Sequence, residues 1–208
     1  MTTAIGTLNV EARDARRVTV ARRTRETDVT VTLDLDGEGT TSIDTGVGFF
    51  DHLLSSLGHH GLFDLEIRAR GDLDVDEHHT VEDTALVMGA AFAEALGDRA
   101  GIVRFGDASV PMDESLATAV VDVGGRPYAV VDLSFRGERA GELPLQLVEH
   151  AIEALARTAG ATIHLSGTGR NDHHLAEAAF KALGRALGAA CEPDPRRRGV
   201  ASTKGSLG

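Results

Sequence analysis

The sequence is poor in cysteine, with Cys191 as the only one in 208 residues. A single thiol forms no internal disulfide and cannot build a zinc site from several cysteines. Tryptophan is absent, and no apolar run approaches the roughly 20 residues that a membrane-spanning helix needs. The stretch 1–17 also lacks the charged start and apolar core of a secretory signal. These absences predict a cytoplasmic protein that does not cross a membrane.

Basic residues are also few: 21 lysines and arginines stand against 32 acidic residues, giving a formal net charge of −11. A surface that binds nucleic acid needs a basic excess to displace counterions from the phosphates. We therefore predict no nucleic-acid partner, although a local basic cluster can still bind a small anion. The remaining composition, 42% apolar and 25% charged, is typical of a folded globular protein.

A five-residue pattern, His-His-x-x-Glu, occurs twice, once at 78–82 and once at 173–177. On an α-helix the first histidine and the glutamate four positions later share a face, whereas the second histidine is turned by about 100°. Each copy therefore offers metal ligands in two directions. The alternative, exposed histidine pairs that merely begin a helix, is weaker because neutral histidine is a poor N-cap. Two copies in one chain predict a metal site.

The apolar pattern alternates between the period of a strand and that of a helix. In the first half it predicts a hairpin at 17–36, a helix at 49–57 that ends at Gly58, a strand at 62–70 and a helix at 80–96 closed by Gly97. In the second half it predicts a strand and hairpin at 101–135, with a tight turn at Gly124-Gly125, and a helix at 143–155 with Pro144 in its first turn. A strand at 161–166 and a final helix through Ala190 follow. The second half thus repeats the element order of the first.

The spacing of the histidines supports a duplication. His52 precedes His78 by 26 positions, and His150 precedes His173 by 23. We predict a first half at 9–100, a second half at 101–192 and a flexible, basic tail at 193–208. Each half is expected to be an α+β layer pair, in which two helices cover one face of a sheet.

The duplicated elements supply six histidines and two carboxylates as candidate metal ligands: His52, His78, His79, His150, His173, His174, Glu82 and Glu177. Divided evenly, they provide three histidines and one glutamate for each of two metals. Nitrogen and oxygen ligands with open positions suit manganese, iron or zinc better than magnesium or calcium. Because consecutive histidines point in different directions, ligands from a neighbouring subunit would complete sites that one chain cannot close. The remaining candidates, His59, His60 and His164, have no counterpart in the repeat and are predicted to be structural.

Eight ordered motifs between about Asn9 and Gly205 carry a family resemblance: RTRET, GFFDH, DEHHTVED, GIVRFG, PMDE, GRPY, NDHH with the following AE and FKA, and STKG. The chain resembles the imidazoleglycerol-phosphate dehydratases, enzymes of histidine biosynthesis that convert imidazole glycerol phosphate into imidazole acetol phosphate and water. The resemblance implies a duplicated fold of the ribosomal protein S5 domain 2-like kind, two Mn²⁺ ions per active site at subunit interfaces, and a homo-24-mer built from trimers. Ser56 stands where relatives have a glutamine, so the resemblance does not extend to a substrate contact there.

The resemblance also implies roles for single residues. It makes Glu26, in the RTRET hairpin, the acid/base carboxylate and a substrate contact, beside Glu82 and Glu177 in the catalytic centre. It assigns the substrate phosphate to Arg104, Arg126, Lys181, Ser202 and Lys204. The tail that carries STKG is expected to order over the bound substrate.

Three other functional hypotheses compete with a dehydratase. The eight ligands would also suit a metal-storage or structural metalloprotein, but basic residues dispersed through an acidic chain favour an anionic substrate. A di-metal hydrolase is the second enzyme hypothesis. The pair Asp34 and Asp36 resembles the nucleophile motif of the haloacid-dehalogenase phosphatases, yet Glu38 stands where that motif has threonine or valine.

Overall fold

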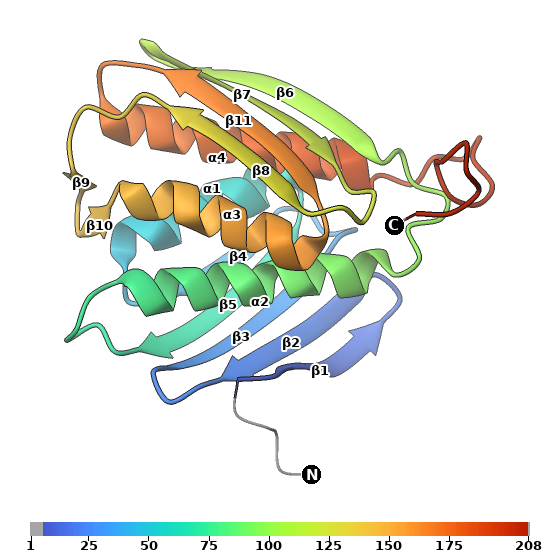
Figure 1. The fold of residues 1–208 in the computed structure, drawn as a ribbon, viewed down its shortest axis with the longest axis horizontal. Helices are drawn as coiled ribbons and strands as arrows, with labels where there is room; N and C mark the ends of the chain where they lie inside the picture. Colours follow the sequence, from blue (N-terminus) through green and yellow to red (C-terminus); the bar gives the residue numbers. More distant parts are fainter. Residues whose placement is uncertain (1–5, 208) are drawn as a thin grey trace.

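The computed structural model describes residues 6–207, which form two β-sheets with helices between them (Figure 1). The first sheet has the order β1 (Leu8–Asp14), β2 (Arg17–Arg23), β3 (Thr27–Asp34), β5 (Asp64–Gly71) and β4 (Thr41–Asp44). The second has the order β6 (Phe105–Met112), β7 (Ser115–Asp122), β11 (Thr162–Thr168) and β8 (Tyr128–Leu133). The helices are α1 (Gly48–Gly61), α2 (His78–Leu96), α3 (Gln146–Ala159) and α4 (Asp172–Cys191).

The two sheets share one topology once the edge strand β1 is set aside. In the first sheet β3 pairs antiparallel with β5, and β5 pairs parallel with β4. In the second sheet β7 pairs antiparallel with β11, and β11 pairs parallel with β8. The predicted α+β architecture of duplicated half-domains is confirmed.

The four helices form the middle layers of the molecule, and they pack across the two halves (Figure 1). Helix α2 lies against α3, and α1 lies against α4. Glycines allow this close approach: a Cβ on Gly89 of α2 would lie 2.5 Å from the carbonyl oxygen of Leu155, and one on Gly184 of α4 would collide with that of Leu57. Each helix pair therefore contains one helix from each half.

The strands bury one face and expose the other, as their alternating sequences predict. In β3, Val29, Val31 and Leu33 are fully buried under the helices, while Thr30 and Thr32 between them lie on the outer side. Four phenylalanines complete the core between the sheets: Phe50, Phe63, Phe92 and Phe180.

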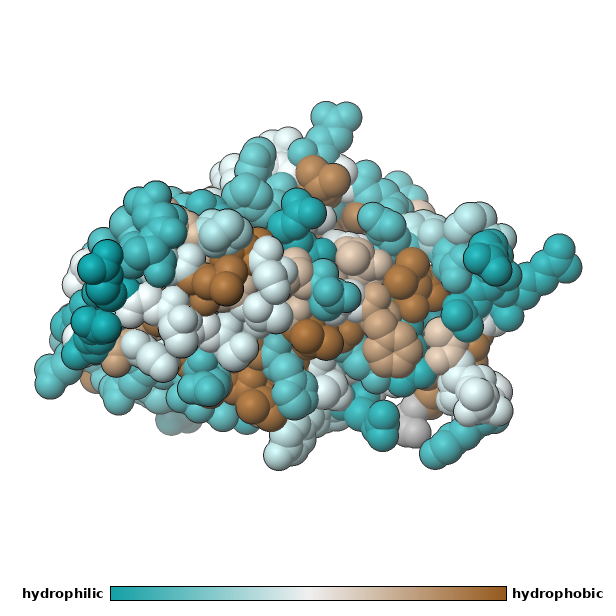
Figure 2. Space-filling model, turned by 90° about the horizontal axis from the view of Figure 1, so that it is seen from above, coloured by the Kyte–Doolittle hydropathy of each residue, from teal (hydrophilic) through white to brown (hydrophobic). Residues whose placement is uncertain are grey.

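The outer faces of the two sheets differ in chemistry. The first carries charged side chains, among them Asp28, Asp34, Glu66, Arg68 and Arg70. The second carries an apolar sheet face made of Phe105, Leu116, Val120, Tyr128 and Val130, whose exposed fractions run from 41% to 65%. In the view onto this sheet, apolar side chains gather along the middle of the face between polar ends (Figure 2).

Helix α1 is longer than the sequence predicts, because Gly58 does not end it. Gly58 lies in the packed interior, where an added Cβ would lie 3.3 Å from the Cβ of Leu65 and closer still to Thr41. The helix runs to Gly61 and is closed by Leu62, which adopts the left-handed conformation at φ 58°. The glycine is required by packing here and not by the helix end.

Two other predictions, one about a turn and one about the start of a helix, are wrong. Gly124-Gly125 does not form a hairpin turn, because β11 lies between β7 and β8 in the sheet. Helix α3 begins at Gln146, since Leu143–Pro144 forms the short strand β10 with β9 (Arg139–Ala140). The strands β1, β4, β9 and β10 were not predicted. Among the described residues, no helix is long and apolar enough to span a membrane, and the cytoplasmic location stays a prediction.

Candidate metal centres and active site

The first cluster of possible metal ligands joins His52 of α1 to His173 and Glu177 of α4. Each residue offers one ligand atom, and these atoms lie within 4.8 Å of one another. Glu177 Oε2 lies 3.0 Å from His52 Nε2 and 3.2 Å from His173 Nε2. The four-residue spacing on α4 brings His173 and Glu177 to one face, and the packing of α1 on α4 adds His52.

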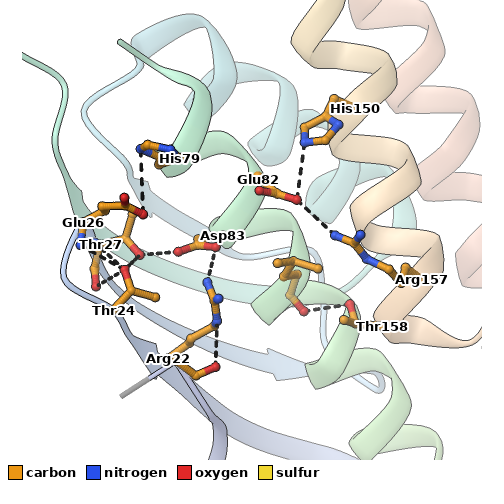
Figure 3. A network of polar contacts seen from close by, with 12 residues as sticks. Arg22, Thr24, Glu26, Thr27, His79, Glu82, Asp83, His150, Arg157 and Thr158 are labelled. Carbon is orange, nitrogen blue, oxygen red and sulfur yellow. Dashed lines mark hydrogen bonds and ion pairs between the residues drawn. The ribbon is translucent and has the colours of Figure 1, made fainter. Parts of the chain in front are cut away.

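The second cluster joins His78 and Glu82 of α2 to His150 of α3, again with the ligand atoms within 4.8 Å. Figure 3 shows Glu82 and His150 facing each other between the two helices. His150 Nε2 lies 3.4 Å from Glu82 Oε1, but the contact lacks hydrogen-bond geometry. This ring nitrogen is buried and has no hydrogen-bond partner among residues 6–207. A buried polar atom without a partner costs free energy unless something binds it. A metal ion bound by His150 would remove that cost.

Both clusters have the donor chemistry of a transition-metal site. Each combines two imidazole nitrogens with one carboxylate, a set that suits Mn, Fe or Zn and leaves positions for further ligands. Each cluster also draws on both halves of the chain, because its lone histidine comes from the helix packed opposite. The residues present therefore fit two divalent metal ions.

The second histidine of each pair lies outside these clusters, so one chain does not assemble three histidines and one glutamate around a metal. The rings of His78 and His79 stand at 86° to each other, as do those of His173 and His174. His79 Nδ1 lies 3.0 Å from Asp72 Oδ2, and His174 Nδ1 lies 3.0 Å from Glu114 Oε2. The rotation of about 100° per residue turns these side chains away from the clusters.

The carboxyl groups of Glu177 and Glu114 have strongly lowered pKa values. Burial disfavours the charged form of Glu177, but hydrogen bonds from His52 and Lys181 outweigh it and lower the pKa to about 2. The hydrogen bond from His174 and the backbone N–H of Arg170 lower the pKa of Glu114 to about 2. Both side chains are therefore ionised near neutral pH.

A cation accompanies the carboxylate of each cluster. Lys181 Nζ lies 2.7 Å from Glu177 Oε1, and Arg157 Nη2 lies 3.1 Å from Glu82 Oε1. The position of Lys181 separates it from the other residues predicted to bind phosphate. Arg157 was not predicted, because nothing in its sequence context distinguishes it from a solvated helix arginine.

The other four predicted phosphate residues lie together. Arg104, Arg126, Ser202 and Lys204 line a hollow of about 330 Å³, called the basic hollow below. The Arg104 guanidinium is held by Asp122, with Nε at 2.7 Å from Oδ1, and donates to the carbonyl oxygen of Ala201. The tail is irregular, as predicted, yet isolated bridges at Val200 and Pro193 attach it to the chain after α2.

The basic hollow lies far from both clusters within one chain. The N–H of Arg104 donates to the carbonyl oxygen of Ala190, which is seventeen residues, or about 26 Å, along α4 from His173. Near Arg126, the N–H of Gly125 donates to the carbonyl oxygen of Gly160, which follows the last residue of α3. Gly160 is ten residues, or about 15 Å along the helix, from His150. The hollow and the clusters therefore occupy opposite ends of the helices.

Glu26 lies in the turn between β2 and β3, and a polar network fixes that turn (Figure 3). Thr24 Oγ1 accepts the backbone N–H groups of Glu26 and Thr27 at 3.1 and 2.9 Å. Thr27 and Arg22 both bind Asp83, a buried residue of α2 that is 6% exposed. Glu26 Oε2 consequently lies 4.0 Å from His79 Nδ1, with the side chain half exposed.

Asp72, Asp83 and Glu114 were not predicted from the sequence, although one signal could have found Glu114. It lies in the β6–β7 turn, which corresponds in the repeated topology to the β2–β3 turn that carries Glu26. Asp72 follows β5 and has no such counterpart. His59, His60 and His164 lie outside both clusters.

Comparisons with known proteins agree with this architecture. The family model of imidazoleglycerol-phosphate dehydratase matches residues 45–187. A curated relative of that name from Methanoculleus marisnigri is 55% identical over 188 residues, which is 90% of this chain and 97% of the relative. One from Gluconacetobacter diazotrophicus is 52% identical and covers 93% of this chain and 98% of its own.

Solved structures give the same result. The imidazoleglycerol-phosphate dehydratase of Staphylococcus aureus superposes with a TM-score of 0.74 at 38% identity, over 80% of this chain and 95% of its own. The enzyme from Pyrococcus furiosus, solved in complex with (S)-C348, gives 0.78 at 36% identity over 90% and 99%.

The fold and the site define a duplicated α+β protein with two candidate metal centres, and its relatives are hydro-lyases. The chain belongs to the imidazoleglycerol-phosphate dehydratase family of histidine biosynthesis.

Proposed function

We propose that this protein is a metal-dependent dehydratase that converts D-erythro-imidazole glycerol phosphate into imidazole acetol phosphate and water. The observation that carries the proposal is the pair of His₂Glu clusters, each built from both halves of a chain of this family. The supporting features are the half-exposed carboxylate of Glu26 beside His79 and the basic hollow at the other end of the helices.

The clusters would hold two Mn²⁺ ions per active site, although other divalent transition metals suit the same donors. Within one chain each ion would receive two histidines and one glutamate. His79 or His174 of a neighbouring copy would supply one further nitrogen to each ion, which restores three histidines and one glutamate per metal. When bound, these ions supply Lewis acidity toward the two ring nitrogens of the substrate.

The reaction removes a hydroxyl from the carbon attached to the imidazole ring and a proton from the neighbouring carbinol carbon. The hydroxyl takes the electron pair of its C–O bond and a proton to become water. The enol that remains gains a proton at the ring-attached carbon, loses the proton of its hydroxyl group and becomes the ketone. Glu26 is our candidate for moving protons at these two carbons, because its carboxylate is half exposed and its backbone is fixed by Thr24.

The phosphate of the substrate would bind in the basic hollow, where Arg104 and Arg126 offer guanidinium groups and Lys204 an ammonium group. Lys181 is better placed to hold Glu177 than to bind this phosphate. The substrate is a short chain of bonds of about 1.5 Å each, so its fully extended length is about 10 Å. It cannot span from a cluster to the hollow of the same chain, so the hollow must come from a neighbouring copy.

A shared site requires an oligomer, and the apolar sheet face is suited to such a contact. Its five large side chains are exposed in one chain, and burying them against a second copy is favourable. We propose the homo-24-mer built from trimers that the family resemblance implies, with a small phosphate ester as substrate and no nucleic-acid or membrane partner.

The purified enzyme with Mn²⁺ is expected to form an enolisable ketone from imidazole glycerol phosphate without releasing phosphate. Ketone formation and free phosphate would be measured in parallel on the same sample, with a chelated sample as control. Phosphate release would instead indicate a di-metal hydrolase. Neither product would indicate a storage or structural role for the metals and would contradict the proposal.

Removing residues 202–208 is expected to raise KM, because the truncation deletes the contacts of Ser202 and Lys204 to the phosphate. Hydrogen bonds to charged groups contribute about 1.5–3 kcal/mol each, and ordering the two residues offsets about 1–2 kcal/mol each, so we expect a net rise of roughly 10-fold to 100-fold. A closing segment also excludes water, so kcat should fall. Ala201 remains and keeps its contact with Arg104.

Steady-state kinetics of the truncated enzyme measure both effects, with metal content and oligomer mass as checks on folding. Arg198→Met removes a charge from the same tail outside the basic hollow and is the matched control. If KM is unchanged by the truncation, Arg104 and Arg126 suffice for the phosphate.

A further inference from the structure

The two histidines outside the clusters have the same environment, although they come from different halves. The Nδ1 atom of His79 lies 3.0 Å from a carboxylate oxygen of Asp72, and that of His174 lies 3.0 Å from one of Glu114. Asp72 follows β5, whereas Glu114 lies in the β6–β7 turn. Two unrelated positions thus supply the same contact to the two corresponding histidines.

An ionised carboxylate accepts hydrogen bonds and donates none. The hydrogen bond therefore requires a proton on Nδ1, and in a neutral imidazole this leaves Nε2 with its lone pair. We infer that Asp72 and Glu114 are positioning residues, which hold His79 and His174 in the tautomer whose Nε2 can bind a metal ion of a neighbouring copy. The inference rests on the proposed function, because it assumes a metal at the subunit contact.

The second oxygen of each carboxylate distinguishes the two positions. Glu114 Oε1 accepts the backbone N–H groups of Arg170 and Asn171 at 2.9 and 2.7 Å, at the start of α4. Asp72 Oδ1 is buried and has no hydrogen-bond partner among residues 6–207. The hydroxyl of Ser115 donates to the same oxygen of Glu114 at 3.3 Å. The orientation of a side chain at 114 is therefore fixed by several donors, whereas one at 72 can turn over.

Because of this difference, the amide variants at the two positions are expected to favour different tautomers of the neighbouring histidine. In Glu114→Gln the amide oxygen stays on the two backbone donors, so the NH₂ group faces His174 Nδ1 and donates to it. The proton of the imidazole then moves to Nε2, which can no longer bind a metal. In Asp72→Asn the amide can turn its oxygen toward His79, and the original tautomer is kept.

Glu114→Gln is expected to weaken metal binding by about 10-fold to 100-fold, the usual effect of losing such a carboxylate. Asp72→Asn should stay within about threefold of the wild type, whereas Asp72→Ala, which has no acceptor, should lose about as much as Glu114→Gln. Asp113→Asn is the matched control, because Asp113 Oδ2 lies 3.9 Å from the same nitrogen of His174 and the side chain is 79% exposed.

The dissociation constant for Mn²⁺ would be measured by competition with a chromophoric chelator. Imidazole nitrogen NMR shifts of the metal-free protein report the tautomer, and urea midpoints show that each variant is folded. The inference is overturned if Glu114→Gln binds Mn²⁺ as the wild type does, or if Asp72→Asn and Asp72→Ala are equally impaired. None of these measurements uses the substrate, so failure of the dehydratase activity would be seen separately in the wild-type enzyme.

Discussion

Glu26→Gln is expected to lower kcat by about 10²-fold or more, which is the usual contribution of a general acid or base. Glutamine keeps the shape of the side chain and its place in the β2–β3 turn, but it cannot take up or release a proton. Metal binding should be unaffected, since Glu26 belongs to neither cluster. Turnover and metal content of the same preparation therefore separate a role in proton transfer from a role in metal binding.

Glu66→Gln is the matched control for this variant. Glu66 is also about half exposed, but it lies on the charged outer face of the first sheet. It should keep wild-type kcat and wild-type metal content. Near-normal turnover of Glu26→Gln would refute the assignment, and a loss of metal in that variant would show that the carboxylate supports His79 instead.

Removing the bound metal is expected to reduce the oligomer to trimers. Without metal, ligands drawn from two copies no longer bind a common ion, so the contacts that depend on it are lost. Burial of the apolar sheet face does not require a metal, and it should hold the smaller oligomer together. Light scattering before and after complete chelation measures the change. One unchanged mass would refute the shared metal sites.

Adding Val120→Lys to the chelated protein should separate the trimers into monomers, because a lysine would then be buried against an apolar partner surface. Val120 is 49% exposed in the single chain. Thr30→Lys is the control, since Thr30 lies in the middle of β3 on the charged outer face of the first sheet. If both variants keep the trimer mass, the apolar sheet face is not the contact.

Much of the fold could be predicted because it depends on local periodicity. Alternation in β3 and helical spacing in α2 and α4 follow from the geometry of one strand or one helix. The local pattern gave a wrong prediction where a residue is required for packing against a segment that is distant in the sequence. Gly58 resembles a helix end but is required by the approach of Leu65, and Gly124-Gly125 resembles a hairpin turn although β11 lies between the strands it joins.

The candidate site divides in the same way. The sequence by itself determined that His173 and Glu177 share a face and that His174 does not, because about 100° of rotation per residue fixes both. It could not determine that His52 joins the second copy of the pattern and His150 the first. That assignment depends on helices packing across the halves, where Gly89 and Gly184 let the backbones approach.

The charged partners divide in the same way. Lys181 binds Glu177 from four residues further along α4, a contact that helical spacing alone allows. Glu114 reaches His174 from sixty residues away, and the position of that partner depends on other elements and is encoded in no local pattern. The basic hollow and the clusters lie at opposite ends of the helices for the same reason, since helix length and packing set that separation.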